Sequence, residues 1–205
     1  MAEFIKLYED PIDQKALRHV VDVLRNGGLV IYPTDTVYGL GCDIQNKKAL
    51  EKVARIKGIK LEKADLSFIC SDLTNLSDHV SQIETSTFKI LKRSLPGPYT
   101  FILPGSNKLP NVFKKKKTVG IRIPDNPIAL AIVRELGNPI VSTSIKDEDE
   151  VIEYTTDPEL IFEKWQNRVD IVIDAGFGGN EASTVIDLTG SSPILIREGK
   201  GKPIL

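Results

Sequence analysis

Apolar positions along the chain follow two periods, one typical of helices and one typical of buried strands. In several segments they recur every three or four positions, and glycine or proline follows most of these segments. This spacing predicts helices over residues 12–24, 47–57, 85–95, 127–136 and 158–166. Short apolar runs bounded by turn residues predict strands over residues 29–32, 66–70, 99–103, 119–123, 140–144, 170–174, 183–188 and 194–197.

The order of these elements indicates the fold class. Helices and strands alternate in the earlier part of the chain, and strands follow one another closely after residue 170. This order predicts an α/β fold on a mixed sheet, with an antiparallel portion near the C-terminus. Because no repeat or low-complexity linker divides the 205 residues, we expect a single domain over residues 1–205.

Composition indicates which ligands and which cellular location to expect. The 27 Lys and Arg residues nearly balance the 28 Asp and Glu residues, so bulk attraction to nucleic acid is not expected, although this balance allows a local basic patch. The two cysteines and two histidines form no ligand pattern, so no protein-held metal site is expected. A signal-peptide pattern is absent and no apolar run reaches the ~20 residues of a membrane helix. We therefore expect a cytoplasmic protein without membrane contact.

Polar side chains gather where several predicted strands end. Arg122, Ser142, Ser144 and Arg197 lie at or near such ends, and Ser183 begins a further strand. Ligands of open α/β sheets bind at strand ends. Hydroxyls and arginines without a nearby Cys or His nucleophile suit an anionic ligand better than acyl transfer. The same hydroxyls are also common in turns and caps, and this structural interpretation stays open for each of them.

The strand predicted at 29–32 leads into a dense polar segment. We expect the hydroxyls of Thr34 and Thr36 to face a cavity and Tyr38 to form part of its wall. The two glycines that follow are expected to allow a close backbone approach. Asp35 is explained equally well as a turn residue that needs no ligand.

Two charged runs have both a structural and a functional explanation. Four lysines at 114–117 form either a solvated loop or an electrostatic funnel for a polyanion. The acidic run at 147–150 is either a solvated loop or a group that holds Mg²⁺ and phosphate. The glycine-rich segment at 174–179 lacks the G-x-x-x-x-G-K-[ST] pattern, so we predict a turn there and not a phosphate loop.

Five blocks of sequence, in their order and spacing, resemble the YrdC family, and most closely its YciO branch. They read Tyr-Pro-Thr-Asp-Thr-Val-Tyr-Gly-Leu-Gly at 32–41, Pro-Gly-Pro-Tyr-Thr at 96–100, Val-Gly-Ile-Arg-Ile-Pro-Asp-Asn-Pro at 119–127, Ser-Thr-Val-Ile-Asp at 183–187 and Arg-Glu-Gly at 197–199. The resemblance implies a twisted mixed β-sheet flanked by helices, with a large concave basic cavity.

The resemblance also implies an activity. Threonylcarbamoyl-AMP synthases of this family condense L-threonine, bicarbonate and ATP to threonylcarbamoyl-AMP and pyrophosphate, for the N6-threonylcarbamoyladenosine modification of tRNA. ATP is a substrate, and Mg²⁺ is expected with it. By resemblance, the expected catalytic residues are Lys57 and Arg122. The residues expected to contact threonine are Thr34, Thr36, Tyr38, Arg122, Ser142 and Ser183, and those expected to contact ATP are Lys57, Thr118, Ser144 and Arg197.

Two triplets depart from the family's pattern, both on the nucleotide side. The family's Lys-x-Arg reads Lys-Gly-Ile at 57–59, and its Ser-x-Asn reads Ser-Ile-Lys at 144–146. The nearby Lys60 and Lys63 could substitute for the missing arginine, but a lysine is a point charge and lacks the guanidinium fork, so these changes indicate weaker synthesis. Two alternatives follow: a non-catalytic protein of the YciO branch that binds tRNA, double-stranded RNA or a nucleotide, and an ATP-dependent enzyme that acts on another amine. The sequence does not define the oligomeric state.

Overall fold

The computed structural model describes residues 1–58, 60–61, 66–111, 113, 117–145 and 153–204. The strands are β1 (Glu3–Lys6), β2 (Val30–Tyr32), β3 (Gly39–Asp43), β4 (Ser67–Ile69), β5 (Tyr99–Pro104), β6 (Thr118–Arg122), β7 (Ile140–Ser144), β8 (Ile171–Asp174), β9 (Thr184–Asp187) and β10 (Ile194–Arg197). The helices are α1 (Gln14–Arg25), α2 (Lys47–Ile56), α3 (Leu73–Ser77), α4 (Thr85–Ser94), α5 (Pro127–Leu136), α6 (Glu153–Thr156) and α7 (Pro158–Trp165).

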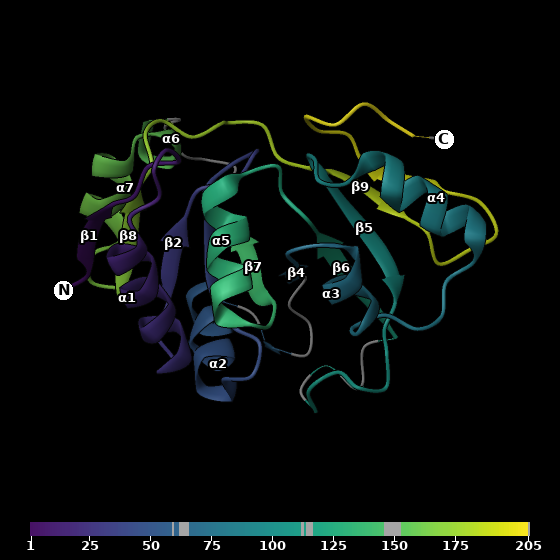
Figure 1. Cartoon of the computed structure of the whole chain (residues 1–205), viewed down its shortest axis with the longest axis horizontal. Coiled ribbons are helices and arrows are strands. Elements are labelled where there is room, and N and C mark those ends of the chain that lie inside the picture. The colour runs from purple at the N-terminus through teal and green to yellow at the C-terminus, as the bar shows by residue number, and fades with distance from the viewer. Residues whose placement is uncertain (59, 62–65, 112, 114–116, 146–152, 205) are drawn as a thin grey trace.

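One mixed sheet of ten strands runs through the described part of the chain (Figure 1). Its order is β1-β8-β2-β3-β7-β4-β6-β5-β9-β10. Strand β8 pairs in parallel with both β1 and β2, whereas β3 pairs antiparallel with β2 and β7. The predicted α/β fold with a mixed sheet flanked by helices is therefore confirmed.

The predicted helices form where the sequence places their caps. Asn126 accepts a hydrogen bond from the backbone N–H of Ala129, and Pro127 occupies the first turn of α5. Gly137 then ends this helix with a left-handed φ of 84°, a conformation that glycine adopts without a steric cost. Helix α2 is capped by Lys57, and the left-handed residue, Gly58 with φ of 67°, follows one position later.

The two faces of the sheet carry separate apolar clusters. Val30 and Tyr32 of β2 pack with α1 and α5 on one face, while the intervening Ile31 belongs to the larger cluster, which includes residues of α2 and α7. Alternate residues of a strand point to opposite faces, so a run of three buried residues requires cover on both sides. Figure 1 shows α1 and α5 side by side in front of this half of the sheet.

Two features of the sheet differ from the sequence prediction. The strand β3 was not predicted, because its sequence Gly-Leu-Gly-Cys-Asp contains two glycines, which are depleted in strands. The three late strands also do not cluster: β8 lies between β1 and β2, whereas β9 and β10 form the opposite edge of the sheet. Only β9 and β10 form the antiparallel pair expected near the C-terminus. Sequence proximity does not determine strand order.

Across the described residues, no helix is both long and apolar enough to cross a membrane. The connection from β8 to β9 contains no helix and runs along one edge of the molecule (Figure 1). In the segment at 174–179, where a turn is predicted, the carboxylate of Asp174 at the end of β8 accepts a hydrogen bond from the backbone N–H of Gly176.

Candidate functional site

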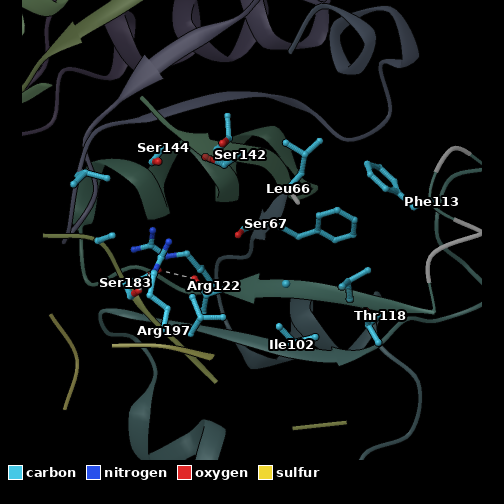
Figure 2. A pocket seen from close by; sticks show the side chains of 18 residues that line it. Leu66, Ser67, Ile102, Phe113, Thr118, Arg122, Ser142, Ser144, Ser183 and Arg197 are labelled. Carbon is cyan, nitrogen blue, oxygen red and sulfur yellow. Dashed lines mark hydrogen bonds between the residues drawn. The ribbon is translucent and has the colours of Figure 1, made fainter. Parts of the chain in front are cut away.

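A cavity of about 640 Å³ lies against β4, β5, β6, β7 and β9. Figure 2 shows that its two ends differ in chemistry. Arg122, Ser183 and Arg197 gather at one end, which we call the arginine end. Leu66 and Phe113 lie toward the other, which we call the apolar end. A ligand that fills the cavity therefore needs an anionic part and an apolar part.

The position of Arg122 is fixed by two neighbours in the polar segment after β2. Its Nη2 donates to Asp35 Oδ1 at 2.8 Å and to Thr36 Oγ1 at 3.0 Å. The side chains of Arg122 and Asp35 are only 11% and 7% exposed, so this is a buried ion pair. Both hydrogens of Nη2 are used in this way, whereas Arg122 Nε is buried without a hydrogen-bond partner in the described part of the chain.

The segment that carries Asp35 and Thr36 is held by its own hydroxyls. Thr34 Oγ1 donates to the backbone carbonyl of Val37 at 2.7 Å and accepts from the backbone N–H of Thr36 at 3.1 Å. This local pattern is common for threonine in turns. It presents the carboxylate of Asp35 and the hydroxyl of Thr36 to Arg122, which lies at the end of β6.

A second guanidinium stands beside the first. Arg197, the last residue of β10, donates through Nη2 to the backbone carbonyl of Ser183 at 2.8 Å. Ser183 Oγ lies 2.8 Å from Thr100 Oγ1, so a hydroxyl pair lines the cavity there. Partial burial and then the nearby charge of Arg122 lower the pKa of Arg197. Among the described residues no carboxylate lies within 4.0 Å of Arg197, so the arginine end has an excess of positive charge.

Two further groups bond residues beside the arginine end without lining the cavity themselves. The Lys200 ammonium donates to the backbone carbonyl of Asp35. Tyr32, at the end of β2, donates from its hydroxyl to Ser142 Oγ at 2.6 Å. Complete burial raises the pKa of Tyr32 to about 12, so this hydroxyl stays protonated at neutral pH.

The apolar end is built by packed rings. Phe68 and Phe113 meet edge to face, with ring centroids 5.0 Å apart. Leu66 lies on the same side of the cavity as Phe113 (Figure 2). An apolar surface of this kind is suited to a flat, weakly polar group such as a nucleobase.

The predicted site residues other than Tyr38 occupy four different positions. The structure brings six of them to the cavity wall: Thr118, Arg122, Ser142, Ser144, Ser183 and Arg197. Thr34 lines a smaller adjoining recess of about 30 Å³, and Thr36 is completely buried against Arg122. Lys57 caps the C-terminal end of α2 and is not among the described residues that line the cavity.

Tyr38 differs from the expectation that it forms a cavity wall. Its hydroxyl donates to the backbone carbonyl of Gly176 at 2.8 Å and accepts from the backbone N–H of Ala175 at 3.2 Å. The side chain is buried against the connection after β8, while its neighbour Val37 lines the cavity. Tyr38 therefore anchors that connection, because its hydroxyl finds both partners away from the cavity.

Several expectations fall on residues outside the described ranges. These are Ile59 and Lys146 of the two departing triplets, three of the four lysines at 114–117, and the acidic run at 147–150. In the described part of the chain, no group of three or more His, Cys, Asp or Glu side chains is arranged to hold a metal ion.

Four residues at or beside the arginine end are not among the predicted site residues, namely Tyr32, Asp35, Thr100 and Lys200. Asp35 was explained as a turn residue, because its partner lies 87 positions away along the chain. The one available signal was a carboxylate between two threonines in a segment that follows a completely buried strand.

Comparisons with known proteins agree on the family. The Sua5/YciO/YrdC family model, "Telomere recombination", matches residues 22–199. The chain is 39% identical to the YciO protein of Escherichia coli K12 over 210 aligned positions, which cover all of both proteins. It is 30% identical to the threonylcarbamoyl-AMP synthase of Halorhodospira halophila, over 83% of this chain and 88% of that protein.

Solved structures give the same result. The crystal structure of Escherichia coli YciO superposes with a TM-score of 0.89 at 38% identity, over 98% of each chain. The structure of Pyrococcus abyssi Sua5 in complex with L-threonine superposes with a TM-score of 0.85 at 30% identity. That match covers 97% of this chain but 58% of the Sua5 chain. This chain therefore belongs to the Sua5/YciO/YrdC family, which includes threonylcarbamoyl-AMP synthases.

Proposed function

We propose that this protein is an L-threonylcarbamoyladenylate synthase-type enzyme that takes L-threonine, bicarbonate and ATP. The observation that carries the proposal is the pair of guanidiniums, Arg122 and Arg197, of which only Arg122 has a carboxylate partner among the described residues. Such a pair suits a carboxylate or phosphate. The related Sua5 structure contains L-threonine, which supports an amino acid as the ligand.

In this proposal, the two substrates share the cavity. The carboxylate of L-threonine binds Arg122, with the hydroxyls of Ser142 and Ser183 beside it. ATP extends from Arg197 toward the apolar end, where Phe113 and Leu66 contact the base. In this proposal, Mg²⁺ enters together with ATP as part of the substrate, and not as a metal ion that the protein holds.

The reaction requires no protein nucleophile. The amine of threonine combines with bicarbonate to give a carbamate and water. A carbamate oxygen then forms a bond to the α-phosphorus of ATP, and the bond to the pyrophosphate oxygen breaks. The described residues that line the cavity include no Cys, His, Asp or Glu, so the chain contributes positioning and charge stabilisation.

The altered triplets 57–59 and 144–146 favour a slow enzyme. Each replaces a hydrogen-bonding side chain of the family pattern, and both are expected on the ATP side. Removal of one preorganised hydrogen-bond donor that stabilises charge in the transition state commonly lowers the rate on the order of 100-fold. The product of this slow reaction would serve the N6-threonylcarbamoyladenosine modification of tRNA.

Pyrophosphate release, measured at high enzyme concentration, tests this function. We expect release that requires both L-threonine and bicarbonate, and mass spectrometry should detect threonylcarbamoyl-AMP. Heat-treated protein and reactions without bicarbonate are the controls. Stronger stimulation by another amino acid would reassign the amine substrate. Binding of ATP and L-threonine without any release would instead indicate a non-catalytic binding protein.

A further inference from the structure

We propose that Tyr32 is a positioning residue that makes the Ser142 hydroxyl a hydrogen-bond donor to the ligand, and so makes the arginine end select a carboxylate over an amide. This inference deepens the proposed function and rests on L-threonine binding at this end. Tyr32 does not line the cavity, so it acts through Ser142.

Tyr32 reaches Ser142 across an intervening strand. In the sheet, β3 separates β2, which carries Tyr32, from β7, which carries Ser142. Tyr32 pairs with Gly39 of β3, and Ser142 pairs with Gly41. The hydroxyl of Tyr32 therefore spans one strand diagonally to make its 2.6 Å hydrogen bond.

The two glycines of β3 make this crossing possible. A Cβ atom on Gly39 would lie 3.0 Å from Ser142 Oγ and 3.2 Å from the Tyr32 hydroxyl oxygen. A Cβ atom on Gly41 would lie 2.8 Å from Cε1 of the Tyr32 ring. A Cβ atom on Gly41 would also lie 2.5 Å from Ile140 Cγ2, so a larger residue there would displace the Tyr32 ring or Ile140. At both glycines the close approach includes Tyr32. The glycines thus serve the site through this tyrosine.

The direction of the hydrogen bond decides what Ser142 offers to the cavity. Tyr32 is the donor, and its hydroxyl stays protonated because burial raises its pKa to about 12. A serine hydroxyl has one hydrogen, which remains available when its oxygen accepts from another group. Within the described part of the chain, Ser142 Oγ has no other hydrogen-bond partner, and Ser142 lines the cavity. Its hydrogen is therefore directed to the ligand.

Arg122 carries a second donor that has no partner in the described part of the chain. Arg122 and Ser142 line the same small recess of about 30 Å³, and Arg122 Nε is buried without a partner in the described part of the chain. Two donors at one recess match the two acceptor oxygens of a carboxylate. A primary amide would place N–H groups against one of these donors, which leaves a buried polar group unsatisfied.

A double-mutant cycle tests the inference by calorimetry with L-threonine and L-threoninamide. The variants are Tyr32→Phe, Ser142→Ala and the combination of both. We expect Tyr32→Phe to weaken L-threonine binding about three- to tenfold and to lower the preference for L-threonine over L-threoninamide. In the Ser142→Ala background, Tyr32→Phe should change neither quantity. An unchanged preference in Tyr32→Phe, or an equal loss in both backgrounds, would overturn the proposal.

Tyr38→Phe is the matched control. It also removes a buried hydroxyl, whose pKa burial likewise raises to about 12, but this hydroxyl bonds the connection after β8. We expect it to lower the melting temperature without changing the preference for L-threonine. This control separates a general loss of stability from the loss of an oriented donor.

The two proposals fail in distinguishable ways. If wild-type protein does not bind L-threonine, the proposed function is wrong, and the cycle is repeated with inorganic pyrophosphate as the probe. If Tyr32→Phe weakens pyrophosphate binding in the wild-type background but not in the Ser142→Ala background, the result would still support a Ser142 hydroxyl oriented by Tyr32. Independent effects of the two substitutions, or binding of neither probe, would overturn it.

Discussion

The two ends of the cavity depend on different forces. The arginine end is held by hydrogen bonds and charge, as in the buried pair of Arg122 and Asp35. The apolar end is held by contacts between rings, as between Phe68 and Phe113. Removal of one member of a buried ion pair leaves an uncompensated charge, whereas a packed wall tolerates residues of similar volume. Recognition is therefore specified by particular atoms at the first end and by shape at the second.

Arg122→Gln, at the arginine end, is expected to have the largest effect on both stability and binding. The substitution leaves the carboxylate of Asp35 buried without its countercharge, and we expect a loss of about 3–5 kcal/mol in the free energy of unfolding. L-Threonine affinity should fall on the order of 100-fold, and ATP affinity should fall less. Urea denaturation and calorimetry measure the two effects.

The double variant Arg122→Gln/Asp35→Asn separates stability from binding. It removes both charges, so much of the stability should return while L-threonine affinity stays low. Recovery of L-threonine affinity in this variant would show that Arg122 does not bind the carboxylate.

Phe113→Leu tests the apolar end with a smaller expected effect. The leucine keeps the wall apolar but loses the edge-to-face contact with Phe68, and we expect ATP affinity to fall about two- to tenfold. L-Threonine affinity should stay within about twofold, since the arginine end is unaltered. Phe4→Leu is a suitable control, because it also loses a ring pair, with Phe162, whose members do not line the cavity. Equal losses of ATP affinity in both variants would contradict this assignment.

The smallest expected effect is a change in stability at low pH, through His79, which packs against Phe68. His79 meets the ring of Phe68 edge-on, and partial burial lowers the pKa of His79 below its usual value. The unfolded chain therefore takes up a proton first as pH falls, so stability is lost from about pH 6.5 downward. His79→Gln removes this titration. Between pH 7.5 and 5, its melting temperature should fall about 1–3 °C less than that of wild type, and parallel curves would exclude this role.

Local periodicity was sufficient to predict many of the elements of the fold. The helix over Pro127–Leu136 was predicted with its observed bounds, because proline and glycine mark its two ends. The strand β3 was missed because its glycines serve a neighbouring tyrosine and give no strand signal of their own. Strand order was also out of reach, since β8 enters the sheet between two strands that precede it by more than a hundred residues.

The candidate site was predictable in its composition and less so in its geometry. Hydroxyls and arginines at strand ends pointed to an anionic ligand, and Arg122, Ser142, Ser183 and Arg197 do line one cavity. Hydrogen-bond partners were not predictable, because a single sequence does not show which distant residues meet. Tyr38 illustrates this limit, since its partners follow β8, a strand that is remote in sequence.

The wide sequence separations at the arginine end have a consequence for local opening of the fold. The bonds that meet there join residues 86, 110 and 165 positions apart, through Thr36 and Arg122, Tyr32 and Ser142, and Asp35 and Lys200. A partial unfolding event that detaches any of these segments destroys the ligand site. A bound ligand therefore opposes each such event by the same free energy, and backbone amide exchange should slow together in strands that never touch the ligand.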